Sequence, residues 1–376
     1  MKNINAVLDK SKYIISEEGF SIFIDRLIRV TIVKTRRLFK NDQKNIQRWR
    51  LLKDQFKDKR VFLIGNGPSL NKTPLHLLKH EYTMCFNRFN LMFERLDWLP
   101  TFYCNIDDRV LLDMKDEING IIGESFQYIF MPDIHPYNIN FKKIIENNDK
   151  IYWLYLEKLP FTQKLPYCGI NKTVASVGLQ ILAYMGFNPI YLIGMDLDYK
   201  DHISAHKNNS RNRTSTSDDD PNHFDPRYFG QGRGYHHPRL EETFVRLKEG
   251  KEFFDKRGVK IFNATIGGKL EVFPRKEFRS LFTIDKNNEF DIFKENIIRK
   301  ISDEINLDQN ARSIESLILS KKVFQSTEID FPSQSDFIIL EAEKALHSIN
   351  ELIFKYIPFG PIEGKYLFVN RAIINK

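Results

Sequence analysis

Short apolar runs alternate with longer amphipathic segments between residues 56 and 285. Most runs are rich in β-branched and aromatic residues and are followed at once by glycine or asparagine, which is typical of buried strands that end in turns. The predicted strands are Val61–Ile64, Tyr82–Phe86, Thr101–Cys104, Phe126–Met131, Ile190–Ile193 and Lys260–Phe262. The amphipathic segments predict helices over Thr173–Met185 and Leu240–Arg257. This alternation predicts an α/β fold, a Rossmann-like and mostly parallel sheet with helices on both faces.

Three segments depart from the alternating pattern. Residues 1–55 are predicted to form a basic helical N-terminal extension, and residues 286–376 a helical C-terminal extension. Within the domain of residues 56–285, residues 200–239 form a long polar insertion, which we expect to be a lid or binding loop. Helices of the C-terminal extension are expected over Phe290–Ile305, Ala311–Val323 and Asp336–Tyr356.

The N-terminal extension contains an amphipathic segment between Phe20 and Phe39. Its basic residues are Arg26, Arg29, Lys34, Arg36, Arg37 and Lys40. A helix of this kind can lie on an anionic membrane with its apolar face down. It can equally pack on the neighbouring domain with its charges in solvent. Both interpretations stay open.

Composition indicates a folded protein outside the membrane. Of the 376 residues 42% are hydrophobic and 28% are charged, which is enough to fill a core and argues against disorder. The sequence has no signal peptide and no apolar run long enough to span a bilayer, and its three cysteines follow no disulfide or metal spacing. We therefore expect a cytoplasmic protein, at most peripheral on the inner face of the cell membrane. The net charge of +8 suits an anionic substrate or membrane, and no nucleic-acid-binding motif accompanies it.

A glycine-rich turn follows the first predicted strand. Its residues are Gly65, Asn66, Gly67, Pro68 and Ser69. Glycines at the carboxyl end of a strand let the backbone approach a ligand closely, and backbone N–H groups there can hold an anionic oxygen. The turn is neither a Walker loop nor a GxGxxG fingerprint. It predicts a phosphate-binding loop, with a plain tight turn as the alternative.

Asparagines follow three of the predicted strands, at Asn66, Asn87 and Asn105. In an open α/β sheet, ligands bind beyond the carboxyl ends of the strands. Three carboxamides there would offer donors and acceptors to ribose hydroxyls, base edges or a sugar carboxylate. Asparagine also ends strands simply because it forms turns, but three together favour a binding site.

Two later strands also end in polar turns. Gly194 and Asp196 follow the strand Ile190–Ile193, and Asp196 can either shape its own loop by accepting hydrogen bonds or contact a ligand. Asn263 ends the last predicted strand, with Lys269 and Arg275 close behind. Cationic side chains at a strand end suit phosphate or carboxylate, although they can also be solvated charges.

The polar insertion carries residue types suited to acid–base chemistry. His236 and His237 stand just before a predicted helix, and imidazole titrates near neutral pH. Tyr228 and Tyr235 can hydrogen-bond phosphate oxygens. The acidic run Asp218–Asp220 has the hard oxygen ligands that Mg²⁺ prefers, but charged runs are commonly only solvated.

Together these segments resemble the domain family of 6-hydroxymethylpterin diphosphokinase-like proteins, which includes the Maf-type flagellin glycosyltransferases. The resemblance spans residues 56–285 and is carried by Val61–Leu70, Thr173–Tyr199, Asp219–Gly230 and Ile261–Pro274. More distantly, the same order is similar to bacterial sialyltransferases of the Campylobacter type. Those enzymes have a Rossmann-like sheet, a CMP-sugar donor and no metal requirement.

The resemblance implies a glycosyltransferase that moves a nonulosonic (sialic-acid-like) or Kdo-like sugar from a CMP donor to a cell-surface glycan or glycolipid, without a metal or other cofactor. The donor-binding residues would be Gly65, Asn66, Gly67, Ser69, Asn87, Asn105, Thr173, Gly194, Asp196 and Asn263. The catalytic residues would be His236 or its neighbour His237 as general base, with Tyr199, Tyr228 and Tyr235 at the departing phosphate.

A second hypothesis is a Mg²⁺-dependent diphosphotransferase that acts on a pterin alcohol with ATP. Asp196, Asp219 and Asp220 would then hold the metal, and the glycine-rich turn would hold the triphosphate. A third is a nucleotide-binding module without catalytic activity.

Overall fold

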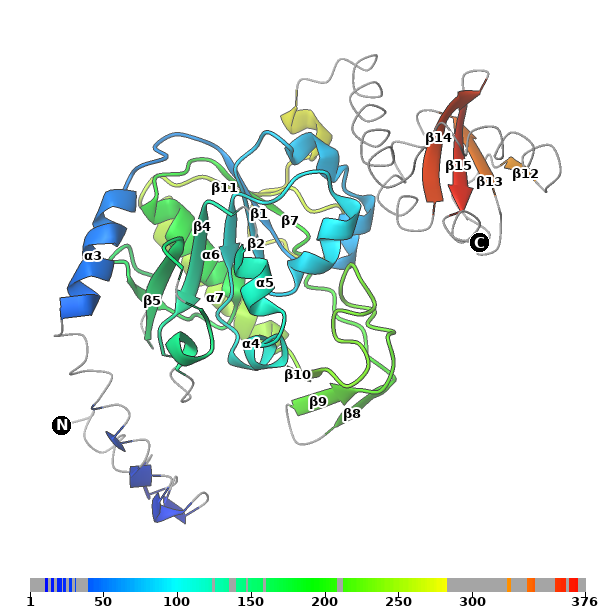
Figure 1. Ribbon diagram of the computed structural model, residues 1–376. Coiled ribbons are helices and arrows are strands. Elements are labelled where there is room, and N and C mark those ends of the chain that lie inside the picture. Colours follow the sequence, from blue (N-terminus) through cyan, green and yellow to red (C-terminus); the bar gives the residue numbers. More distant parts are fainter. Residues whose placement is uncertain are drawn as a thin grey trace.

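The fold is built on an eight-stranded sheet in which neighbouring strands pair in parallel (Figure 1). The computed structural model describes residues 40–282, apart from 124–125, 135–139, 147, 158–159 and 208–211, together with helical pieces between residues 11 and 31 and four strands beyond residue 322. In spatial order the strands are β11 (Ile261–Asn263), β7 (Ile190–Ile193), β1 (Val61–Ile64), β2 (Thr83–Phe86), β3 (Phe102–Cys104), β4 (Tyr128–Pro132), β5 (Ile151–Glu157) and β6 (Tyr167–Gly169). The predicted parallel, Rossmann-like sheet is confirmed, and β5 and β6 are added to it.

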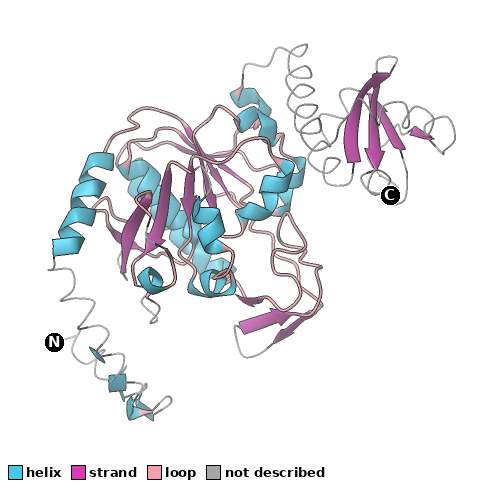
Figure 2. Cartoon of the chain, in the orientation of Figure 1, coloured by secondary structure: helices cyan, strands magenta, loops and turns pink. Residues whose placement is uncertain are grey.

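Helices cover both faces of this sheet (Figure 2). On one face lie α3 (Lys40–Leu52), α6 (Val174–Tyr184) and α7 (Leu240–Asp255). On the other lie α4 (Asp108–Asp113), α5 (Ile118–Gly123) and the 3-10 helices η1 (Pro68–Lys72), η2 (Leu75–Leu78) and η3 (Phe89–Arg95). Successive side chains of a strand point to opposite faces, so Val61 and Leu63 enter the first core whereas Phe62 and Ile64 enter the second. Burial on both sides explains why the strands are continuous apolar runs.

Helix α3 is part of this packed domain. Trp49 is fully buried, and its indole N–H donates to the Trp153 carbonyl over 3.0 Å. Asn45 bonds the backbone of the same residue in both directions, and the Tyr184 hydroxyl donates to the Trp49 carbonyl. The packed domain therefore begins before residue 56, where the sequence predicted its boundary.

The segment before α3 is helical where the structure describes it, and Phe20, Leu27 and Ile28 are exposed there. Its basic residues from Arg26 to Arg37 lie outside the described residues. Across the described parts of the chain, no helix is long and apolar enough to cross a membrane.

The insertion of residues 200–239, which the sequence predicted as a loop, contains a small antiparallel sheet. Its strands are β8 (Ala205–Lys207), β9 (Asn212–Ser215) and β10 (Gly234–His236), in the order β10-β9-β8. These strands are short and polar, so they lack the hydrophobic alternation by which a strand is recognised in a sequence.

The C-terminal extension contains a second sheet, of four strands. They are β12 (Val323–Gln325), β13 (Phe337–Glu341), β14 (Tyr356–Ile362) and β15 (Lys365–Asn370), in the order β12-β13-β15-β14. The predicted helix over Asp336–Tyr356 is wrong at its start, because Phe337–Glu341 pairs antiparallel with β15. A short apolar run fits a buried strand as well as a helix, so its periodicity does not distinguish the two. The helix predicted over Phe290–Ile305 lies outside the described residues.

The packing of α3 can be tested with two neighbouring residues. Trp49→Ala should lower the free energy of unfolding by about 3–5 kcal/mol, because it removes a fully buried indole. Leu51→Ala is the matched control: its side chain is 79% exposed, and the change should stay within about 0.5 kcal/mol. Urea denaturation of the full chain measures both. Equal, small losses would show that α3 is not part of the core.

Candidate functional site

The chain reverses its direction of travel across the sheet between β1 and β7. From β1 the strands are added one after another out to β6, and the chain then crosses back through α6 to place β7 and β11 on the other side of β1. In open parallel sheets such a switch point forms a crevice beyond the carboxyl ends of the two strands. The turns that follow β1 and β7 lie at this switch point.

These two turns are in direct backbone contact. The Gly65 amide donates to the Ile193 carbonyl over 2.8 Å, and the Gly67 amide donates to the Gly194 carbonyl over 2.9 Å. A Cβ atom on Gly67 would lie 1.8 Å from a carboxylate oxygen of Asp196. Gly194 itself has φ +63°, in the left-handed region that favours glycine. The glycines are therefore required for the two turns to approach each other.

Asp196 fastens the two turns together. Its carboxylate accepts hydrogen bonds from the Ser69 hydroxyl over 2.7 Å and from the Ser69 amide over 3.2 Å. Burial raises the pKa of Asp196, and the bonds from Ser69 oppose that rise. Of the two roles that the sequence left open for Asp196, the structure supports the first, in which it shapes the loop.

This arrangement bears on the predicted phosphate-binding loop, because it engages most of the backbone donors of the turn. The amides of Gly65, Gly67 and Ser69 all donate within the protein, and Pro68 has no N–H to offer. These three amides are thus not available to an anionic oxygen in this arrangement. The turn is a structural joint between β1 and β7.

The three asparagines lie at the carboxyl ends of adjacent strands. Asn66 follows β1, Asn87 follows β2 and Asn105 follows β3. The side-chain oxygen of each is buried without a hydrogen-bond partner among the described atoms. Burying a carboxamide oxygen in this way costs free energy unless a ligand or water completes it. The prediction that these residues come together at one edge of the sheet is met.

The amide nitrogens of the asparagines are in part already occupied. Asn66 Nδ2 lies 3.3 Å from the Phe86 carbonyl and 3.2 Å from the Tyr228 hydroxyl. Asn105 Nδ2 lies 3.4 Å from the Tyr103 hydroxyl. With these N–H groups engaged and the buried oxygens unpaired, the carboxamides at this edge of the sheet offer hydrogen-bond acceptors. It suits a ligand group that donates hydrogen bonds.

The polar insertion is fixed over this edge by a buried ion pair. Asp225 is fully buried and lies 2.7 Å from the guanidinium of Arg95, whose side chain is 4% exposed. Arg227 pairs with the same carboxylate over 2.9 Å. Next to this pair the Phe224 amide donates to the Asn66 carbonyl over 2.9 Å, so the insertion is bonded directly to the turn after β1.

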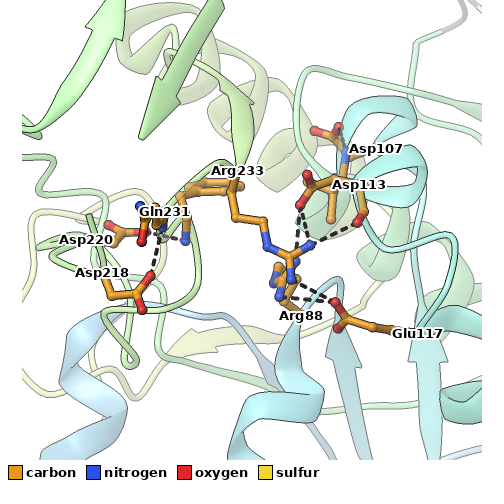
Figure 3. A network of polar contacts seen from close by, with 10 residues as sticks. Arg88, Asp107, Asp113, Glu117, Asp218, Asp220, Gln231 and Arg233 are labelled. Atoms are coloured by element: carbon orange, nitrogen blue, oxygen red, sulfur yellow. Dashed lines mark hydrogen bonds and ion pairs between the residues drawn. The ribbon is translucent and has the colours of Figure 1, made fainter. Parts of the chain in front are cut away.

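A second ionic network fastens the insertion to α4 and α5 (Figure 3). Arg233, which precedes β10, pairs with Asp113 over 3.1 Å and with Glu117 over 2.9 Å. Arg88, next to Asn87, is buried and pairs with the same two carboxylates. The insertion is thus docked on the sheet edge through two separate ionic contacts.

The docked insertion brings the predicted tyrosines into one aromatic cluster. The Tyr228 ring stacks on the ring of His223 at 3.8 Å with an interplanar angle of 2°. The Phe229 ring lies nearly perpendicular to both rings and stacks on Tyr235 at 4.5 Å. Tyr199, from the turn after β7, lies edge-on to His223 at 6.3 Å. Tyr199, Tyr228 and Tyr235 therefore belong to a single site.

All three tyrosines are held in the protonated form. The pKa of Tyr199 is raised to about 12 by desolvation and by the carboxylates of Asp220 and Asp196, although 38% of the residue surface stays accessible. Burial raises the pKa of Tyr228 and of Tyr235 as well. Near neutral pH these phenols are hydrogen-bond donors.

Two aspartate–histidine pairs accompany the tyrosines. His223 Nδ1 lies 2.7 Å from Asp220 Oδ2, and His202 Nε2 lies 2.8 Å from Asp219 Oδ1. His202 Nδ1 is also 3.3 Å from the Tyr235 hydroxyl. Neither histidine was selected from the sequence as a site residue. The signal was the three-residue spacing of Asp220 and His223, which begins at the end of the acidic run Asp218–Asp220.

The histidines that were selected lie elsewhere in the insertion. His236 is the last residue of β10 and is half-buried. His237 is exposed, and its Nδ1 donates to the Pro238 carbonyl over 3.1 Å. The aspartate-paired histidines of the insertion are thus His223 and His202.

Two predicted donor-binding residues serve the backbone instead. Thr173 caps α6, with its hydroxyl accepting from the Ala175 amide over 3.3 Å. Asn263 is fully buried; its Nδ2 donates to the Leu270 carbonyl and its Oδ1 accepts from the Thr265 amide. Both are therefore explained without a ligand.

The cations near Asn263 are also engaged by the protein. Arg275 donates to the carbonyls of Thr265 and Gly268 over 2.9 and 3.0 Å. Lys269 pairs with Asp198 over 2.6 Å at the surface. They hold the turn after β11 in shape.

The aspartates of the metal hypothesis are held by separate partners. Asp196 binds Ser69, Asp219 binds His202 and Asp220 binds His223. Over the described stretches of the chain, no three His, Cys, Asp or Glu side chains are grouped as a metal ion would require.

Removing the buried ion pair tests whether it holds the insertion. Asp225→Ala should lower the free energy of unfolding by about 3 kcal/mol, because Arg95 stays buried without its counter-charge. Glu94→Ala is the control: it removes a carboxylate that is 61% exposed and pairs with Arg227 over 3.4 Å, and should cost about 1 kcal/mol or less. Urea denaturation measures the two changes. A similar, small loss in both variants would contradict the role of the pair.

The same pair predicts how stability varies with pH. Burial alone would raise the pKa of Asp225, but the hydrogen bonds and charges of Arg227 and Arg95 outweigh it and leave the pKa lowered. The stabilisation is therefore complete above the ordinary carboxyl pKa of about 4 and is lost as the pH falls through the lower folded value. Asp225→Asn should lose less stability than the wild type over this acidic range.

Parts of this chain are similar to known proteins. Residues 36–202, from before α3 to the start of the insertion, match the family model described as 6-hydroxymethylpterin diphosphokinase MptE-like. No curated protein matches the chain. Among solved structures, the MAf glycosyltransferase from Magnetospirillum magneticum AMB-1 aligns at 13% identity with a TM-score of 0.39, over 67% of this chain and 41% of that one. This chain therefore spans less than half the length of that protein. The predicted resemblance to 6-hydroxymethylpterin diphosphokinase-like proteins is confirmed as a match over residues 36–202, and the more distant likeness to Campylobacter-type sialyltransferases stays a prediction.

Proposed function

We propose that the chain is a glycosyltransferase that moves a nonulosonic, sialic-acid-like or Kdo-like sugar from a CMP donor to a hydroxyl of a cell-surface glycan or glycolipid. The observation that carries the proposal is the row of carboxamide oxygens of Asn66, Asn87 and Asn105, each buried without a hydrogen-bond partner among the described atoms. Such oxygens accept hydrogen bonds from an amino group or a hydroxyl and repel an anion. The amino group of cytosine and the hydroxyls of ribose and sugar are donors of this kind.

The tyrosine cluster suits the charge that develops when CMP leaves. Tyr199, Tyr228 and Tyr235 are kept protonated, so Tyr199 and Tyr228 can each donate a hydrogen bond to a departing phosphate oxygen. Tyr235 can do the same once its hydroxyl turns from His202 Nδ1, 3.3 Å away. Donors fixed where negative charge develops stabilise a transition state without reorganising. CMP leaves as a phosphate monoester, and in this proposal the transfer needs no metal ion.

The acceptor hydroxyl must lose its proton as it attacks, and we assign that task to a histidine of the insertion. Imidazole is the side chain whose ordinary pKa lies near neutrality, which suits it as a general base. His236 and His237 were the candidates from the sequence, and His223 joins them because it is part of the aromatic cluster.

Peripheral contact with an anionic membrane belongs to the same proposal. It rests on the basic sequence of the N-terminal extension and on the exposure of Phe20, Leu27 and Ile28 in its described helical pieces. Such contact would bring the enzyme to a glycolipid acceptor.

A second candidate function is Mg²⁺-dependent diphosphate transfer from ATP to a pterin alcohol. The description of the matching family favours it, and the amino group of a pterin would also suit the asparagine oxygens. This candidate is weaker in how it binds triphosphate. The glycine-rich turn was predicted to hold that group, but the amides of Gly65, Gly67 and Ser69 are hydrogen-bonded within the protein.

A nucleotide screen separates the two candidates. CMP and CDP should raise the melting temperature of the full chain, and the effect should persist in EDTA, because the open acceptors are protein groups and not a metal. Differential scanning fluorimetry with CMP, CDP, ATP and ATP with Mg²⁺ makes the comparison. Stabilisation by ATP with Mg²⁺ alone would contradict the glycosyltransferase proposal.

The asparagine row predicts a specific loss of affinity. Asn87 has φ +50°, so Asn87→Gly removes the carboxamide while keeping a backbone that glycine readily adopts. We expect CMP affinity, measured by calorimetry, to fall about tenfold for one lost hydrogen bond, with stability changed by about 1 kcal/mol or less. Asn263→Ala is the opposite control, because the hydrogen bonds of that side chain are to its own loop. It should lower the free energy of unfolding more than it lowers the affinity for CMP. Unchanged CMP affinity in Asn87→Gly would remove Asn87 from the site.

A further inference from the structure

The histidines of the insertion differ in what holds their rings. The side chain of Asp220 is 1% exposed. Besides its contact with His223 Nδ1, it accepts hydrogen bonds from the backbone amides of Asn222 over 2.9 Å and Phe229 over 3.2 Å. Burial alone would raise the pKa of Asp220, but these hydrogen bonds and the proximity of His223 outweigh it and lower the pKa. Asp220 is therefore an ionised carboxylate fixed in place beneath the imidazole.

An ionised carboxylate at Nδ1 determines the tautomer of His223. The proton of the neutral ring sits on Nδ1, where Asp220 accepts it, and the lone pair is on Nε2. Within the described residues Nε2 has no hydrogen-bond partner, and the side chain of His223 is 9% exposed. The ring thus presents one unprotonated nitrogen that is not used by the protein.

The ring of His223 is also fixed next to the edge where the asparagines lie. It stacks face to face on Tyr228, and the hydroxyl of Tyr228 is 3.2 Å from Asn66 Nδ2 at the end of β1. The Phe229 ring also lies nearly perpendicular to the His223 ring, with 5.0 Å between their centres. One aromatic ring therefore separates His223 from the strand ends.

Neither His202 nor His237 has this combination. His202 uses both ring nitrogens, one with Asp219 and one with the Tyr235 hydroxyl, so its lone pair is already occupied. His237 is exposed and bonded to the carbonyl of the next residue.

We infer that His223 is the catalytic base of this site and that Asp220 is its positioning residue. The inference rests on the proposed function, in which a hydroxyl attacks the sugar of the donor. As the hydroxyl oxygen bonds to the anomeric carbon, its proton passes to His223 Nε2. The bond from that carbon to the phosphate oxygen breaks, and its electron pair leaves with CMP. Asp220 stays ionised and stabilises the imidazolium that forms.

The tautomer can be measured without any substrate. In the full chain labelled with ¹⁵N-histidine, long-range proton–nitrogen correlation spectra distinguish a protonated nitrogen from an unprotonated one, and His223→Gln identifies the signals by their loss. We expect Nδ1 to be protonated and Nε2 unprotonated in the neutral ring, and Asp220→Ala to give a mixture of tautomers. A neutral ring protonated at Nε2 in the wild type would overturn the inference.

Transfer assays then test the role itself. With a CMP-sialic acid donor, His223→Gln should lower kcat about 100-fold or more while the Kd for CMP stays within about threefold. Asp220→Asn should lower kcat less and shift the acidic limb of the pH–rate profile, which a merely structural change would leave in place. His206→Gln, an exposed histidine on β8, is the matched control and should stay active.

The outcomes separate the inference from the function on which it rests. Full activity in His223→Gln, or inactivity of His236→Gln beside an active His223→Gln, would overturn the assignment of the base. A wild type that transfers no sugar from any CMP donor would overturn the proposed function. The spectra would then still decide whether Asp220 fixes His223 with Nε2 unprotonated.

Discussion

The contact between the turns after β1 and β7 is the constraint on which the site depends. Gly65 and Gly67 must approach Ile193 and Gly194 closely enough for backbone hydrogen bonds, and Asp196 then fastens Ser69 across the junction. A side chain on Gly67 would collide with Asp196. The junction uses its polar groups internally, so ligand binding must fall to the side chains that surround it.

The insertion supplies those side chains because it is docked and not free. A buried pair between Asp225 and Arg95 and the network around Arg88 and Arg233 hold it at two points on the helical layer. Between them, the stack of Tyr228 on His223 reaches the asparagine at the end of β1. Open acceptors from the sheet and protonated phenols from the insertion thus meet at one edge, which is the basis for proposing transfer from a nucleotide sugar.

The sequence predicted the parts of this site that have a strong local signal. Apolar runs ended by glycine or asparagine located most strands of the central sheet, and the row Asn66, Asn87 and Asn105 followed from their shared position after a strand. The sequence could not show that amides of the glycine-rich turn donate hydrogen bonds to carbonyls at the end of β7. That depends on which strand becomes the neighbour of β1. It also did not single out His223, since the pairing of His223 with Asp220 is visible only when a polar stretch is folded against the domain. The strand Phe337–Glu341 was missed because a short apolar run suits either kind of element.

A crystal structure of the full chain with CMP would test the central claim most directly. We predict that the cytosine amino group or the ribose hydroxyls lie within hydrogen-bonding distance of the side-chain oxygens of Asn66, Asn87 or Asn105. The phosphate should then point toward Tyr199, Tyr228 or Tyr235. A nucleotide whose phosphate sits on the amides of Gly65 and Gly67, with the asparagine oxygens left open, would contradict the account.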